Sequence, residues 1–240
     1  SMYILITRQL EQSKKFSSLL KKKNIKNFIL PAINIKNIKP KAHDLENLHK
    51  SNFIIFTSQN SVTSLMENLT PKNLRNKKIA AIGKSTKQIL NDMKIHVDIC
   101  PKSDFTSESL LQEIKENAII NKKILVIKGL GGRTYLHEEL LKENTVYDDL
   151  VIYERHLPEG INKFSPSVLK DITHICITSI DVLNNFLVIC NILKIKIEKH
   201  VIFVAGNQRI ANECRNFFSF NKVLISLNPS NGEMLKTILN

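Results

Sequence analysis

The sequence contains no tryptophan, no long apolar run and no closely spaced pair of cysteines. Aromatic residues make up only 6% of the chain, and no stretch interleaves them with basic residues as nucleic-acid-binding modules do. No run of about 18 apolar residues occurs, so we expect no membrane span. With 240 residues, 42% of them hydrophobic, the chain is long enough for one large globular domain or two of ordinary size.

The four cysteines indicate a reducing compartment. Cys100, Cys176, Cys190 and Cys214 form no Cys-x-x-Cys pair, and Cys176 and Cys190 lie within apolar runs. We therefore expect buried free thiols rather than disulfides. The opening residues enter a strand-like run without the basic segment of a signal peptide, so the expected localisation is cytoplasmic.

The chain is strongly basic, with a net charge of +13 and a pI near 9.6. A solvated, lysine-rich surface explains much of this charge, because runs such as residues 21–23 usually face water. The sharper interpretation is a polyanionic partner, either a nucleic acid, a phosphate ester or a polycarboxylate. The sequence has no zinc-finger spacing and no RNA-binding signature, which counts against nucleic acid.

Apolar runs of four to seven residues alternate with helical patterns along the whole chain. This alternation predicts an α/β fold with parallel sheets covered on both faces. The middle of the chain also repeats in its C-terminal part, in the same order. The matching segments are 53–58 (FIIFTS) with 174–179 (HICITS), 79–83 (IAAIG) with 201–206 (VIFVAG), and 97–101 with 223–229. We interpret the repeat as a duplication of a flavodoxin-like, doubly wound lobe with about five parallel strands.

Two extended segments suggest how the lobes are connected. Residues 31–40 (PAINIKNIKP) are bracketed by prolines and alternate apolar with polar residues, and residues 148–156 have a similar extended character. We therefore expect a two-stranded linker at residues 34–38 and 150–156. The predicted lobe 1 is discontinuous, with residues 1–33 and 157–240, and lobe 2 is inserted, with residues 39–149.

Polar residues gather where the predicted strands end and the next helices begin. In open α/β sheets, ligands bind beyond the carboxyl ends of the strands, and helix N-termini favour anions. Any single Ser or Thr at such a position is equally well explained as an ordinary helix cap. Several strand ends that carry polar residues around the same edge of the fold favour ligand binding instead. The anion-binding candidates at these strand ends are Arg8, Thr57, Ser58, Lys84, Ser85, Thr86, Thr178, Ser179, Asn207 and Gln208.

The remaining motifs point away from nucleotide, metal or nucleophile chemistry. Residues 129–133 (GLGGR) resemble a phosphate loop but lack its Gly-Lys-Ser/Thr ending, so Gly129 and Arg133 are retained only as a turn with an anion contact. His137-Glu138-Glu139 is not a His-Glu-x-x-His metal motif, and no Gly-x-Ser-x-Gly elbow occurs. An enzyme with this inventory would act by binding and orienting a charged substrate, and we expect neither a cofactor nor a metal.

Several motifs, in order along essentially the whole chain, resemble those of the uroporphyrinogen-III synthase family. They are residues 4–8 (ILITR), 56–62 (FTSQNSV), 81–86 (AIGKST), 128–133 (KGLGGR), 151–155 (VIYER) and 178–179 (TS). The resemblance implies two lobes joined by a two-stranded linker, with an active cleft between them. It also implies a cyclising lyase that closes hydroxymethylbilane into uroporphyrinogen III, with inversion of ring D and loss of water, in tetrapyrrole and haem biosynthesis.

The resemblance assigns roles to individual residues as well. Tyr153 matches the family's one candidate acid, and the alternative interpretation is a strand aromatic that packs between the lobes. Thr86 matches a threonine used at a helix start in the inserted lobe. The C-terminal copy departs from the family pattern, because the chain has Asn207-Gln208 where a hydroxyl-rich turn is usual. We therefore expect the two lobes to bind substrate carboxylates unequally.

The resemblance also implies the partners. The substrate would be a linear tetrapyrrole polycarboxylate, taken over from the preceding enzyme of the pathway. From the residues themselves we expect no nucleic acid and no membrane, and a monomeric chain because no exposed apolar helix face stands out. The alternative is a non-catalytic two-lobed binding protein for a small polyanionic ligand. A nucleic-acid-binding module would rest on charge alone and would require steeply salt-dependent binding.

Overall fold

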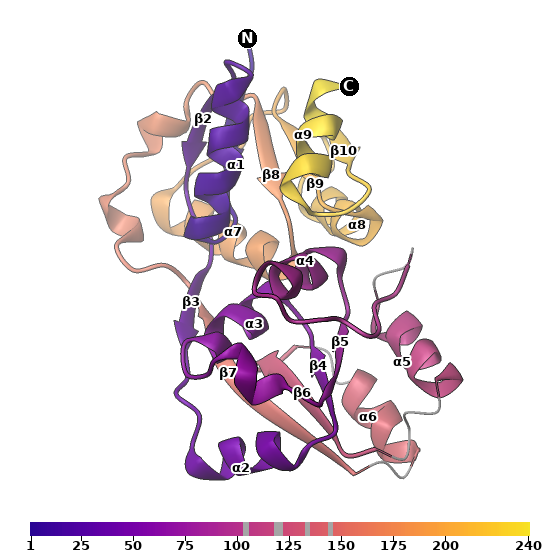
Figure 1. The fold of residues 1–240 in the computed structure, drawn as a ribbon. Helices are drawn as coiled ribbons and strands as arrows, with labels where there is room; N and C mark the ends of the chain where they lie inside the picture. Colours follow the sequence, from indigo (N-terminus) through magenta and orange to yellow (C-terminus); the bar gives the residue numbers. More distant parts are fainter. Residues whose placement is uncertain (103–105, 118–121, 133–134, 144–145) are drawn as a thin grey trace. The chain divides into compact units, whose positions relative to one another are not determined.

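The computed structural model describes residues 1–102, 106–117, 122–132, 135–143 and 146–240. The chain divides into two compact units (Figure 1). Unit 1 comprises Ser1–Asn34 and His156–Asn240, and unit 2 comprises Ile35–Arg155. No helix among the described residues is long and apolar enough to cross a membrane.

Unit 1 is a parallel five-stranded sheet with the order β10-β9-β8-β1-β2. Numbered along the unit, this is the 2-1-3-4-5 order of flavodoxin-like folds read from the other edge. Its elements are β1 (Tyr3–Ile6), α1 (Leu10–Lys22), β2 (Lys26–Ile29), β8 (His174–Ile177), α7 (Ile180–Leu193), β9 (Ile202–Ala205), α8 (Gln208–Phe217), β10 (Val223–Ile225) and α9 (Asn231–Leu239), with short 3-10 turns at Ile161–Lys163 and Pro166–Leu169.

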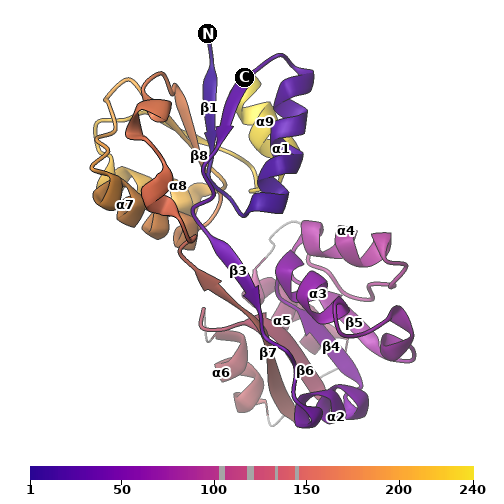
Figure 2. The same ribbon diagram turned by 90° about the vertical axis from the view of Figure 1, so that its left-hand side faces the viewer.

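Helices cover both faces of this sheet, α1 and α9 on one side and α7 and α8 on the other (Figure 2). Ile4 and Ile6 point to the first side, where they pack in one fully apolar cluster with Phe16 of α1 and Met234 of α9. Successive strand residues face opposite sides, so the even-numbered residues of β1 define the α1 and α9 face.

Unit 2 is a five-stranded sheet with the order β3-β7-β6-β4-β5, in which β7, β6, β4 and β5 pair in parallel. Its elements are β3 (Asn34–Asn37), α2 (Ala42–Lys50), β4 (Phe53–Phe56), α3 (Gln59–Met66), a 3-10 turn (Pro71–Leu74), β5 (Lys78–Ala81), α4 (Lys84–Asp92), α5 (Ser107–Glu116), β6 (Ile124–Gly129), α6 (Tyr135–Lys142) and β7 (Tyr147–His156). The segment predicted as an extended connector thus forms β3, a four-residue strand at the edge of the sheet.

The two sheets are circular permutations of one another. Beyond β5, a single parallel bridge from Ala80 to Ile99 adds the start of a further strand. Reading across unit 2 from that bridge gives β5, β4, β6 and β7, which occupy the places of β9, β8, β1 and β2 in unit 1. The pair β1–β2 opens the chain, whereas its counterpart β6–β7 closes unit 2. The predicted duplicated α/β fold is therefore confirmed.

The strand register corrects one detail of the repeat. Phe56 pairs with Ala81, and its counterpart Ile177 pairs with Ala205. Ile82 therefore corresponds to Gly206, and Gly83 corresponds to Asn207, so the matched glycines of the sequence repeat lie one residue out of step. Gly83 and Asn207 are accordingly the N-caps of α4 and α8.

The cysteines are free thiols, as predicted. Cys176, Cys190 and Cys214 are buried, and Cys100 is half-buried. Burial raises the pKa of each buried thiol to about 12, so these thiols stay protonated near neutral pH. They serve as small apolar core residues.

Candidate active site

Three side chains converge at the carboxyl end of the sheet in unit 2. The hydroxyl of Tyr153, on β7, lies 2.8 Å from the hydroxyl oxygen of Ser58, at the start of α3. Arg155, two residues further along β7, donates from Nη2 to the same phenol oxygen over 3.0 Å. Because strand residues two apart share a face, Tyr153 and Arg155 reach this point together. We call Ser58, Tyr153 and Arg155 the hydroxyl cluster.

The phenol of Tyr153 lies inside the protein. The residue is 0% exposed and belongs to the apolar core of unit 2, whereas Ser58 and Arg155 are both partly exposed. The ring lies against Gly129 at the end of β6, where a Cβ atom would come within 2.6 Å of two ring carbons. Gly129 is therefore required by the close approach of the ring rather than by a turn.

Ser58 has a second function as the N-cap of α3. Its hydroxyl oxygen accepts a hydrogen bond from the backbone N–H of Ser61 over 3.1 Å, and the Ser61 hydroxyl donates to the carbonyl of Ser58. These bonds fix the position of the Ser58 oxygen and leave its single hydrogen to point either at Tyr153 or away from it. Three parts of unit 2 therefore position the hydroxyl cluster, namely the start of α3, the strand β7 and the backbone of Gly129.

The other candidates of unit 2 differ in how available they are. The Thr57 hydroxyl donates to the carbonyl of Ile127, tying β4 to β6. At the start of α4, Lys84 is exposed, Ser85 is half-buried and Thr86 is buried. Gly83, the N-cap of α4, has no side chain with which to cap the helix. The first N–H groups of α4 therefore have no side-chain cap from that residue, unlike those of α3.

The candidates of unit 1 lie at the equivalent edge of its own sheet. Ser179 caps α7 by accepting from the N–H of Val182 over 3.1 Å, and Asn207 caps α8 by accepting from the N–H of Ile210 over 2.9 Å. Gln208 donates to Asn212 within α8, and Thr178 is half-buried before Ser179. The helix α4 thus begins with Lys84, Ser85 and Thr86 after a glycine N-cap, whereas α8 begins after Asn207, whose side-chain amide caps the helix.

Arg8, also in unit 1, is used to join two parts of the fold. Its Nη1 donates to the carbonyl of Pro229 over 2.8 Å and to the side-chain oxygen of Asn231 over 2.9 Å, and its Nε donates to Gln12 over 3.2 Å. Burial lowers the pKa of this guanidinium to about 10. Arg8 therefore ties the end of β1 to the turn that precedes α9.

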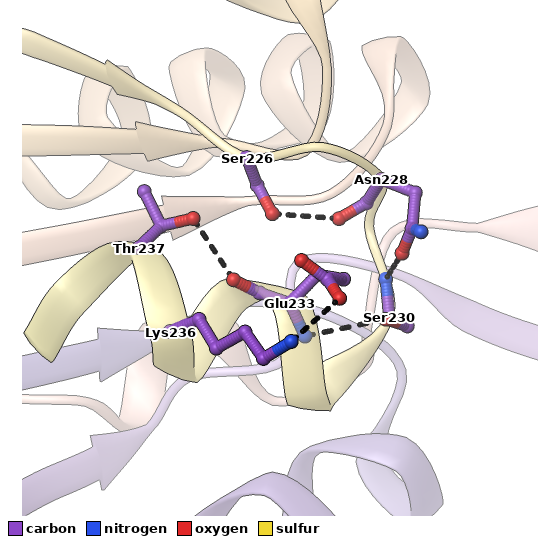
Figure 3. Close-up of polar contacts among 6 residues, drawn as sticks. All are labelled: Ser226, Asn228, Ser230, Glu233, Lys236 and Thr237. Atoms are coloured by element: carbon purple, nitrogen blue, oxygen red, sulfur yellow. Dashed lines mark hydrogen bonds and ion pairs between the residues drawn. The ribbon is translucent and has the colours of Figure 1, made fainter. Parts of the chain in front are cut away.

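That turn is itself internally bonded (Figure 3). The hydroxyl of Ser226 donates to the carbonyl of Asn228 over 2.8 Å, and the side-chain oxygen of Asn228 accepts from the N–H of Ser230 over 3.0 Å. Ser230 then caps α9 by accepting from the N–H of Glu233 over 3.3 Å. Arg8 thus contacts a turn whose conformation is fixed by its own polar side chains.

The structure brings together part of the predicted set. Ser58, Gly129 and Tyr153 meet in unit 2, and the Thr57 side chain bonds to the backbone of β6. Arg133 lies outside the described residues, so its place is not described. Sequence reasoning missed Arg155 as a site residue, although the Tyr-x-Arg spacing on a strand was a usable signal. Among the described residues, no group of three or more histidine, cysteine, aspartate or glutamate side chains could hold a metal ion.

Comparisons with known proteins agree with one another. A family model described as uroporphyrinogen-III synthase HemD matches residues 14–236. A candidate uroporphyrinogen-III synthase of Methanocaldococcus jannaschii is 35% identical over 179 residues, covering 71% of this chain and 70% of that protein. The crystal structure of uroporphyrinogen-III synthetase from Helicobacter pylori aligns with a TM-score of 0.66 at 18% identity, over 100% of this chain and 99% of the other. A mutant uroporphyrinogen III synthase from Thermus thermophilus aligns with a TM-score of 0.63 at 15% identity, over 100% and 98%. The two structures establish the likeness of fold.

Proposed function

We propose that this chain, which belongs to the uroporphyrinogen-III synthase family of cyclising lyases, converts hydroxymethylbilane to uroporphyrinogen III. The linear substrate loses its terminal hydroxyl as water. The substituted carbon of ring D then attacks the exposed methylene carbon, and a spiro intermediate rearranges to the ring-inverted macrocycle. Unassisted closure gives the symmetric type I isomer. The protein must therefore hold the two ends of the substrate in the other orientation, which requires groups that bind and position the substrate.

The binding groups of both units suit a substrate with eight carboxylates. Helix N-termini offer N–H donors and the positive ends of helix dipoles to anions. The net charge of +13 would draw such a substrate to the protein. We assign carboxylate binding to the strand-end residues, namely Arg8, Thr57, Ser58, Lys84, Ser85, Thr86, Gly129, Arg133, Thr178, Ser179, Asn207 and Gln208. In this assignment Arg8 contributes through its Nη2 group, because its Nη1 and Nε donors are bound within the fold.

The hydroxyl cluster is the observation that carries the proposed chemistry. The departing hydroxyl needs a proton, and Tyr153 is the family's candidate donor. Because Tyr153 is fully buried, we assign the contact with substrate to Ser58. Ser58 passes its hydrogen to the leaving hydroxyl and takes the phenol hydrogen of Tyr153 over 2.8 Å. Arg155, donating to the phenol oxygen, stabilises the negative charge that this transfer leaves there.

Replacing the phenol tests this relay. Tyr153→Phe removes one hydroxyl from the core while keeping the ring against Gly129, so we expect the fold to survive. The turnover number for hydroxymethylbilane should fall by about 10²-fold or more, the range for loss of a positioned proton donor, and Ser58→Thr should keep part of the activity by retaining a hydroxyl. Matched variants are Tyr135→Phe and Tyr147→Phe, which remove a phenol elsewhere in unit 2. A wild-type turnover number in Tyr153→Phe would remove Tyr153 from the mechanism.

A non-catalytic binding protein for a polyanion remains the alternative function. It predicts tight binding of hydroxymethylbilane together with the type I product formed at the spontaneous rate. The isomer composition of the product therefore separates the two functions.

A further inference from the structure

The permuted duplication identifies a basic residue in unit 2 that occupies the place of Arg8. In unit 1, Ile6 of β1 pairs with Cys176 of β8. In unit 2, Val126 of β6 pairs with Ile55 of β4. Cys176 and Ile55 are equivalent positions of the repeated FIIFTS and HICITS segments. Val126 therefore corresponds to Ile6, and Lys128 corresponds to Arg8.

The packing of the two sheets gives the same correspondence independently. Ile6 faces the cluster formed with α1 and α9, and Arg8, two residues on, reaches Gln12 and Asn231 of those helices. Val126 faces the cluster formed with α5 and α6, which follow the equivalent strands of unit 2. Lys128, two residues on, therefore leaves β6 on that same face. Both units thus place a cation at the carboxyl end of the equivalent strand, β1 or β6.

The two cations differ in what they bind. Arg8 donates three hydrogen bonds within unit 1. Within the part of the chain that the structure describes, the ammonium group of Lys128 makes no hydrogen bond or ion pair, although the residue is half-buried. A half-buried ammonium at a strand end is a suitable partner for a carboxylate, since it gains a charge-assisted hydrogen bond there.

Lys128 and the hydroxyl cluster both stand at the carboxyl end of the unit 2 sheet, but on opposite faces, because Val126 and Lys128 face α5 and α6 whereas Tyr153 packs with α3 and α4. Lys128 precedes Gly129, whose backbone supports the Tyr153 ring, and a β-bulge interrupts the pairing with β7 between Lys128 and Gly129. The extra residue of this bulge is Ile152 of β7, so the bulge brings Tyr153 opposite Gly129, and bulges are frequent beside functional sites. On the other side of β6, Thr57 bonds to the carbonyl of Ile127, the residue before Lys128.

We propose that Lys128 binds a substrate carboxylate at the carboxyl end of β6, in addition to the strand-end residues assigned above. This assignment rests on the proposed function. The duplicated fold would then use one position in two ways, as a structural tie in unit 1 and as a ligand in unit 2.

The test compares Lys128→Met with Lys123→Met. Lys123 is also half-buried and lies immediately before the same strand, but at its opposite end. Losing a charge-assisted hydrogen bond should raise the KM for hydroxymethylbilane about tenfold in Lys128→Met, with little change in kcat. Lys128→Arg should restore most of the affinity, and Lys123→Met should behave as wild type. Lys128→Gln is a second neutral variant in case methionine disturbs the packing, and thermal unfolding checks each fold.

The outcomes separate the two proposals. An unchanged KM in both neutral Lys128 variants, in a wild-type protein that forms type III product, would overturn the role of Lys128 alone. An equal rise in Lys123→Met would also overturn it, because the effect would then be one of overall charge. A wild-type protein that gives only type I product would contradict the proposed function itself.

Discussion

The contact between Gly129 and Tyr153 shows how one small residue determines the position of a reactive one. With any side chain at position 129, a Cβ atom would meet the ring at 2.6 Å, closer than carbon atoms pack. The ring would have to move, and its hydroxyl would move away from Ser58 and Arg155. The glycine of the KGLGGR segment is thus explained by the tyrosine of β7, and not by phosphate binding.

Gly129→Ala tests this relation. We expect the free energy of unfolding to fall by about 1–3 kcal/mol, the usual cost of overpacking a core. In a Tyr153→Leu background the same change should cost less than about 0.5 kcal/mol, because the clashing ring is absent. Urea unfolding of the four proteins of this double-mutant cycle gives the comparison. An equal cost in both backgrounds would show that Gly129 is required for another reason.

Residue roles were the part of the site hardest to predict. Motifs placed Ser58 and Tyr153 in the candidate set from the sequence. Their bond could not be predicted, because it joins residues 95 apart in sequence and depends on the packing of β7 against α3. Arg8 was predicted as an anion ligand on the ground of its strand-end position, and that role stays a proposal. Its bonds to Pro229 and Asn231 are long-range contacts that no local pattern shows.

At the scale of elements, helix caps decide where the helices begin. The helix α5 begins at Ser107 and the helix α9 at Asn231. In both cases a hydroxyl just upstream, Thr106 or Ser230, accepts the N–H bond that opens the helix. Apolar periodicity marks the buried face of a helix and carries little information about its first turn.

The caps also make the two lobes chemically different. Asn207 caps α8 with its side chain, whereas its counterpart Gly83 cannot cap α4 in this way. We expect Asn207→Ala to lower the free energy of unfolding by about 1 kcal/mol. The matched control is Asn212→Ala, an exposed position inside the same helix, where alanine should be neutral or slightly stabilising. Equal destabilisation by both changes, measured by urea unfolding, would contradict the capping role.

At the scale of the whole molecule, the order of strands follows from simple constraints on the chain. Apolar runs separated by helical patterns restrict the fold to parallel sheets with right-handed crossovers. The repeated segments identified the duplication because two of them, 53–58 with 174–179 and 79–83 with 201–206, contain equivalent strands that lead into the next helix in both units, and the third contains the Ile99 bridge in unit 2 and β10 in unit 1. The permutation was not predicted, since the β1–β2 and β6–β7 pairs share too little sequence to be matched before the strand register is known.

The proposed role of the protein is to direct ring closure to the inverted isomer. The most direct measurement supplies freshly made hydroxymethylbilane, oxidises the product and separates the type I and type III uroporphyrins. We predict mainly type III product, formed faster than the spontaneous reaction and in proportion to the amount of protein added. Type I product alone, at the rate observed without protein, would contradict the account.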